Sequence, residues 1–179
     1  MRGPFKRDPY RFPAHGARLT AYAVMPGFAI PRVSVPASLL LTDGDRRPGE
    51  IYVMERVPQH SGPETPLEML NRPEGFFPFR PEGNGKILLV TKAHTITLSV
   101  ATDNAAQDPA RLSAAKLVAL ELTFIDGSTL NGFATAELPE HHSRLLDYLN
   151  DSNPFFAVSA GEEFHFVNRA HVLYARPED

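Results

Sequence analysis

The histidines and carboxylates of the chain are the side chains best suited to holding a metal ion or moving a proton. Their densest group is Glu140-His141-His142, with Asp147 close behind it in the sequence. A zinc site needs three or four converging ligands. Adjacent histidines on a loop point in different directions, so a further ligand such as His165 would have to come from elsewhere. An exposed polar loop explains the group more simply, and we predict no metal site.

Sequence patterns that carry catalysis are missing. The chain has no cysteine, which excludes thiol catalysis, thiolate zinc sites and disulfides. It also has no G-x-S-x-G or H-E-x-x-H pattern, the marks of a serine hydrolase and a zinc protease. Gly83-Asn84-Gly85-Lys86 is similar to the end of a phosphate-binding loop, but Ile87 stands where a magnesium-binding Ser or Thr belongs. A turn between strands fits better, and we predict no catalytic residue and no cofactor.

Four polar residues recur along the chain: Asn71 and Asn150, and the basic Lys92 and Arg169. Each asparagine stands where it could end a short helix in the left-handed C-cap conformation. His94 and His171 follow the two basic residues and could each donate to a backbone carbonyl of a turn.

Short motifs recur along the chain in one order, which indicates a tandem duplication. The order is Asp-Gly, a second glycine, a Leu-x-x-Leu-Asn segment, a Phe pair, and a basic residue followed by Ala-His. The first copy has Asp43-Gly44, Gly49, residues 67–71, Phe76-Phe77 and Lys92-Ala93-His94, and the second has Asp126-Gly127, Gly132, residues 146–150, Phe155-Phe156 and Arg169-Ala170-His171.

Local patterns predict the elements of each copy. Apolar and other residues alternate through residues 118–124, as in a half-buried strand. Each Asp-Gly then predicts a hairpin turn, because glycine accepts a positive φ. The glycine inside the next strand indicates a bend or a close backbone approach. Thr65-Pro66-Leu67-Glu68 has the form of a capping box that begins a short helix.

The predicted fold is mostly β, with one short helix per repeat. We expect a flexible basic, proline-rich arm at residues 1–16, a first module at 17–100, a linker at 101–114 and a second module at 115–176. So small a module buries little surface by itself. The two are therefore expected to pack as small barrels or half-barrels with pseudo-twofold symmetry.

The order of these features resembles the Sm-like small β-barrel, and also short bacterial β modules to which we can assign no activity. The Sm-like family has a strand, Asp-Gly and a second glycine, which Asp126-Gly127 and Gly132 match. Its later motif of an apolar residue, Arg, Gly and a β-branched run is similar to residues 167–174, with Ala170 in place of glycine. A helical segment replaces the family's tight loop. The resemblance implies an SH3-like barrel and RNA contacts at Asn71, Lys92, Asn150 and Arg169.

Composition favours a protein partner over nucleic acid. The net charge of −3 supplies no basic field for RNA or an anionic membrane. No apolar run suits a signal peptide or a membrane span, so we expect a bacterial cytoplasmic protein. The expected function is a non-catalytic adaptor or assembly module that presents β-surface to a protein partner or to further copies of itself. Binding of single-stranded RNA or a nucleotide is the alternative, and an enzyme of unrecognised class is the third.

Overall fold

The computed structural model describes residues 32–83, 85–104, 116–136 and 145–178. Within them, ten strands form one antiparallel open sheet in the order β10-β6-β7-β8-β9-β5-β1-β2-β3-β4. The strands are β1 (Arg32–Leu41), β2 (Arg46–Met54), β3 (Phe76–Pro81), β4 (Leu88–Thr91), β5 (Thr95–Ala101), β6 (Lys116–Phe124), β7 (Thr129–Ala136), β8 (Phe155–Ala160), β9 (Glu163–Asn168) and β10 (Val172–Pro177). The helices are α1 (Pro66–Asn71), α3 (Leu145–Leu149) and the 3-10 helices η1 (Lys92–His94), η2 (Thr102–Asn104) and η3 (Arg169–His171). The prediction of a mostly β protein with short helices is confirmed.

The first half of the sheet, β1 to β5, and the second half, β6 to β10, have the same strand order. It is β5-β1-β2-β3-β4 in one and β10-β6-β7-β8-β9 in the other. The register agrees as well, since Phe76 lies opposite Thr91 in the first half and Phe155 lies opposite Asn168 in the second. Residues at the same place in this shared order are equivalent positions of the two halves.

Local sequence signals account for the turns and for the start of α1. Gly44 and Gly127 both have a φ of 82° in the turns that follow β1 and β6. Thr65 is the N-cap of α1, with both hydrogen bonds of the capping box to Glu68 in place and proline in the first turn. The predicted Asp-Gly turns and capping box are confirmed.

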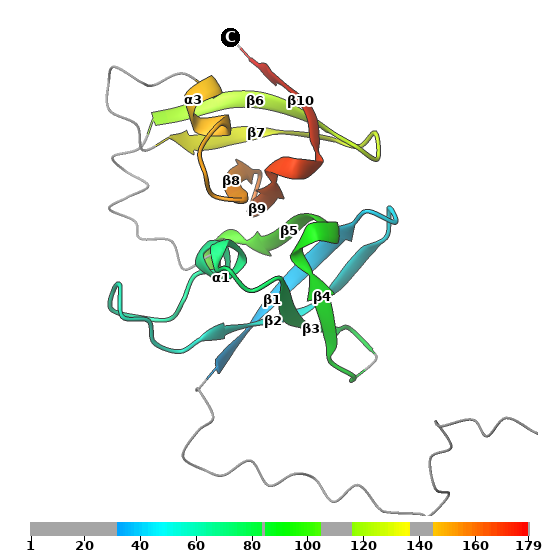
Figure 1. Cartoon of the computed structure of the whole chain (residues 1–179), viewed down its shortest axis with the longest axis vertical. Coiled ribbons are helices and arrows are strands. Elements are labelled where there is room, and N and C mark those ends of the chain that lie inside the picture. Colours follow the sequence, from blue (N-terminus) through cyan, green and yellow to red (C-terminus); the bar gives the residue numbers. More distant parts are fainter. Residues whose placement is uncertain (1–31, 84, 105–115, 137–144, 179) are drawn as a thin grey trace, which may run out of the picture.

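The two halves join edge to edge through β5 and β9, which form the junction. β5 pairs with β9 from Thr97 opposite Val167 to Ala101 opposite Glu163. Figure 1 shows these two strands between the halves. In the strand order of the sheet, β10 and β4 are the two ends. The described strands form no closed barrel. To close a half, β4 would have to pair with β5, or β9 with β10. Instead β5 and β9 pair with each other, and β4 and β10 are the ends of the sheet.

The predicted pseudo-twofold packing is wrong. A twofold axis brings the same element of each half into contact, whereas β5 is the last strand of its half and β9 is the fourth strand of the other. The relation between the halves is therefore head-to-tail. As a result, β4 lies at one end of the sheet and β10 at the other. β4 is the equivalent of β9, and β10 is the equivalent of β5.

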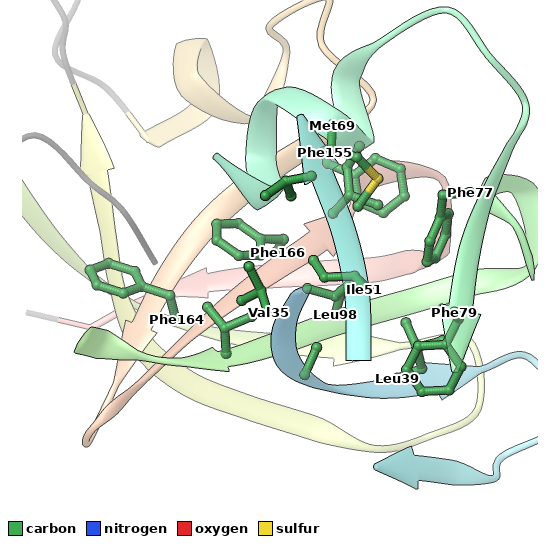
Figure 2. Packing of buried hydrophobic residues seen from close by; sticks show 14 of the residues in the cluster. Val35, Leu39, Ile51, Met69, Phe77, Phe79, Leu98, Phe155, Phe164 and Phe166 are labelled. Atoms are coloured by element: carbon green, nitrogen blue, oxygen red, sulfur yellow. The ribbon is translucent and has the colours of Figure 1, made fainter. Parts of the chain in front are cut away.

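Each of the two apolar cores draws side chains from both halves. Phe155, Phe164 and Phe166 of the second half lie in the core of the first half, with Leu98 of β5, and Figure 2 shows them there. In the other direction, Ile96 of β5 lies in the core of the second half. Edge pairing thus continues into shared side-chain packing, which is the main source of stability in a sheet of this kind.

Several predicted segments lie outside the described residues. They are the arm at residues 1–16, residues 17–31 and 84 of the first module, residues 105–114 of the linker, and residues 115 and 137–144 of the second module, which include the Glu140-His141-His142 group. The first four residues of the predicted linker are described: Ala101 is the last residue of β5, and residues 102–104 form η2.

Candidate functional site

The two recurring basic residues bind the ends of the short helices. Lys92 Nζ donates to the carbonyl of Met69 in α1 at 2.9 Å. At the equivalent place, Arg169 Nη2 donates to the carbonyl of Tyr148 in α3 at 2.9 Å. Burial lowers the pKa of both side chains, although each stays cationic at neutral pH. Carbonyls left open at a helix end need donors of this kind, so both side chains have a structural use, and an RNA phosphate would compete with it.

The two recurring asparagines lie in different surroundings. The Asn71 side chain donates from Nδ2 to the carbonyl of Phe155 at 3.1 Å and accepts from the N–H of Phe155 at 2.9 Å. It thereby connects α1 to β8 across the junction. The left-handed C-cap predicted for Asn71 is wrong, because it is the last helical residue and Arg72 after it is extended. Asn150 is exposed, and its backbone N–H donates to the Leu146 carbonyl.

Polar side chains of the second half also bind the backbone of η1 and of the first residue of β5. His171 Nε2 donates to the carbonyl of Ala93 at 2.6 Å. Asn168 Nδ2 donates to the carbonyls of Lys92 and Thr95, both at 3.1 Å. His171 thus has the predicted bond to a turn carbonyl, and the turn belongs to the other half. These contacts fix the register of the junction.

His165 is the titratable side chain buried in the junction itself. Its Nδ1 is hydrogen bonded to the Ser99 hydroxyl at 2.8 Å. Burial lowers its pKa; the Glu163 carboxylate, 3.6 Å from Nε2, opposes this shift, and Arg46 adds to it. The folded protein therefore favours the neutral imidazole, which suits a hydrogen-bonding role inside a paired sheet.

Acid should weaken the junction through His165. Below the unfolded-state pKa of about 6.5 the unfolded chain takes up a proton that the folded chain resists, so stability falls as the pH falls from about 6.5 toward the lowered pKa of the folded state. Urea unfolding at pH values of about 7.5 and about 5.5 should show a smaller pH-dependent loss in His165→Gln than in the wild type. His94→Gln, at an exposed histidine, is the control. Equal losses in His165→Gln and the wild type would contradict this assignment.

The described residues supply little for catalysis or metal binding. They include no group of three His, Cys, Asp or Glu side chains that could hold a metal ion. An open groove beside β2 and β3 is lined by prolines and glycines, with Glu50, Arg80 and Glu82 as its charged residues. Glu50 and Arg80 form an exposed ion pair at 3.6 Å. This groove brings no nucleophile and base together.

No described helix has the length and apolar character needed to cross a bilayer.

The feature that stands out is a pair of apolar open edges at the two ends of the sheet. Ile87, Leu88 and Leu89 are exposed at β4, and Leu173 and Tyr174 are exposed at β10. Along each strand, the backbone groups that face outward have no neighbouring strand in the described sheet. An unpaired edge with apolar side chains is a template for another strand. We call β4 and β10, with these five side chains, the open edges.

Sequence reasoning missed the open edges because it could not place the strands within a sheet. One signal was available: residues 87–90 are a continuous apolar run next to a Gly-rich turn. Such a run predicts a strand buried on both faces. Here the strand lies at an edge, so Ile87, Leu88 and Leu89 are exposed and Val90 alone of the run is buried.

Comparisons with protein-family models, with curated proteins and with solved structures give no match to this chain.

Proposed function

We propose that the chain is a tandem pair of five-stranded modules, each like the Sm-like module that its sequence resembles, and that it acts as a non-catalytic assembly module. Its open edges bind protein by adding strands to the sheet. The observation that carries this proposal is the exposure of Ile87, Leu88, Leu89, Leu173 and Tyr174 at the only two ends of the described sheet. Main-chain hydrogen bonds then give affinity, and the apolar side chains give specificity.

The backbone of each open edge supports strand addition. In an antiparallel strand, successive N–H groups point to opposite sides. The N–H of Lys92 donates to the carbonyl of Gly75, on the β3 side. Leu89 is three residues earlier, so its N–H points to the opposite side, away from β3. The N–H of Glu178 donates to the carbonyl of Ala119, on the β6 side. Ala175 is three residues earlier, so its N–H points away from β6. Both edges therefore offer donors to an incoming strand.

Proline at these two positions should block binding and leave the sheet intact. Leu89→Pro and Ala175→Pro each remove an outward N–H that no neighbouring strand uses, and proline is tolerated at edge strands for this reason. Tagged wild-type chain, expressed in its native cells, should co-purify a polypeptide in stoichiometric amount. Each proline variant should lose what its own edge binds. Leu117→Lys, which adds a charge at an exposed apolar residue on β6, should bind like the wild type.

Other results would overturn the proposal. Retention of the polypeptide by both proline variants would show that the open edges are not the binding surface. Recovery of nucleic acid in place of protein would favour the alternative function. In that case oligonucleotide binding should fall steeply with salt, and a Lys92→Ala, Arg169→Ala double variant should abolish it.

A further inference from the structure

The junction inside the chain provides a pattern for contact at the open edges. β9 and β5 pair with each other between the halves. Their equivalents are β4 and β10, and these are the two open edges. One end of the sheet thus carries the counterpart of one junction strand, and the other end carries the counterpart of the other.

Burial supports the comparison residue by residue. Phe166 is 0% exposed in the junction, whereas its equivalent on β4, Leu89, is 73% exposed. Phe164 is 5% exposed, and its equivalent Ile87 is 52% exposed. The described protein therefore exposes, on β4 and at Ile87 just before it, the apolar positions that are buried on β9.

The β10 edge shows the same contrast. Ile96 of β5 is 0% exposed, because it packs into the core of the second half. Its equivalent on β10, Leu173, is 63% exposed. At both edges, the exposed apolar side chains are the equivalents of those that the β5–β9 junction buries. A contact of the same kind at each edge would bury them.

We propose that β10 of one copy of this chain pairs antiparallel with β4 of the next copy and reproduces the β5–β9 junction between chains. This inference rests on the proposed function and names its partner as the chain itself. In the register of the internal junction, Tyr174 lies opposite Val90, Ala175 opposite Leu89 and Arg176 opposite Leu88 of the next copy. Glu178 then lies opposite Lys86, a pair of opposite charges.

The hydrogen bonds suit this register. Leu98 and Phe166 face each other in the internal junction, and their equivalents, Ala175 and Leu89, each have an outward N–H. Pro177 replaces Val100 at the next outward position and supplies no donor. The ladder between chains is therefore shorter than the internal one, which makes this contact the weaker and dissociable of the two.

One side-chain contact extends the pattern beyond the edge strands. Asn71 holds both backbone groups of Phe155 across the internal junction. The equivalent pair between chains is Asn150, which is exposed, and Phe76 of the next copy, which is 62% exposed. Asn150 is thus assigned to the same task at the contact between copies.

A head-to-tail contact uses a different surface on each partner, so every added copy presents a fresh edge until a ring closes. Native mass spectrometry and light scattering of the purified full chain test this. The wild type should have a mass several-fold that of one chain and should dissociate on dilution. Leu89→Pro and Ala175→Pro, each with the wild-type circular dichroism spectrum, should have the mass of one chain.

Mixing the two proline variants gives the sharpest result. Leu89→Pro keeps an intact β10 and Ala175→Pro keeps an intact β4, so the mixture should form a one-to-one dimer of twice the single-chain mass. If either variant dimerises alone, the contact joins two like edges and the head-to-tail inference fails. If proline disturbs folding, Leu89→Lys and Leu173→Lys replace the two variants, with the same expectations.

The test separates this inference from the proposed function. A wild-type chain that stays monomeric at all concentrations overturns self-assembly. If that monomer still binds a different polypeptide in cells, and loses it in Leu89→Pro or in Ala175→Pro, the proposed function stands with another partner. If neither occurs, both fail.

Discussion

Replacement of Phe166 by alanine is expected to lower the free energy of unfolding by about 3–5 kcal/mol, the usual cost of removing a buried phenylalanine. The side chain is fully buried in the core of the first half, although it belongs to β9 of the second half. The loss combines the apolar surface no longer buried with the cavity that remains. Urea unfolding followed by circular dichroism measures it.

Phe133→Ala is the matched control for Phe166. Phe133 is also a strand phenylalanine, on β7, but its side chain is exposed. Its replacement should change stability by less than about 0.5 kcal/mol, as is usual for surface positions. Equal effects of the two substitutions would mean that Phe166 is not packed across the junction.

The second large effect is expected at Gly132. A Cβ at this position would lie 2.5 Å from the carbonyl oxygen of Ser159 and 2.7 Å from Cγ1 of Val158. One of these neighbours is backbone, so β7 and β8 would have to move apart. Overpacking of this kind costs about 1–3 kcal/mol. Gly132→Ala should therefore lower the urea midpoint of unfolding clearly.

Gly75→Ala provides the comparison for Gly132. A Cβ at Gly75 would meet no atom within 4 Å, and its φ is not in the left-handed region. Alanine there should be nearly neutral in the same unfolding experiment. A loss at Gly75 as large as that at Gly132 would show that the effect is general to glycine and not due to the close approach of β8.

The local structure could be predicted from the sequence because its causes are local. Thr65, Pro66 and Glu68 satisfy the start of α1 within one turn, and the capping box is present. Asp-Gly gives the turn after β1 because a positive φ suits glycine. The glycine inside β7 indicated a close backbone approach, and the Ser159 carbonyl makes one.

The relation between the halves could not be predicted, because edge pairing depends on residues far apart in the chain. Alternation shows which face of a strand is buried but not which strand lies beside it. A comparison of β5 with β10 contains a hint. Ser99 and Val100 of β5 correspond to Arg176 and Pro177 of β10, and charge with proline is typical of an edge strand.

The candidate RNA-binding residues illustrate a different gap. Lys92 and Arg169 each hold the end of a helix in their own half. Recurrence alone does not separate this use from a ligand contact. Asn71 has a role that no local pattern indicates, since its partner Phe155 lies 84 residues away.

The shared cores bear on how the chain denatures. A module with a complete core of its own can melt while its neighbour stays folded. Here Phe164 and Phe166 would leave the core of the first half if the second half unfolded, and Ile96 would leave the core of the second half if the first unfolded. Calorimetry should therefore record one heat-absorption peak with equal calorimetric and van't Hoff enthalpies. By that measure, a sheet with two similar halves is one thermodynamic domain.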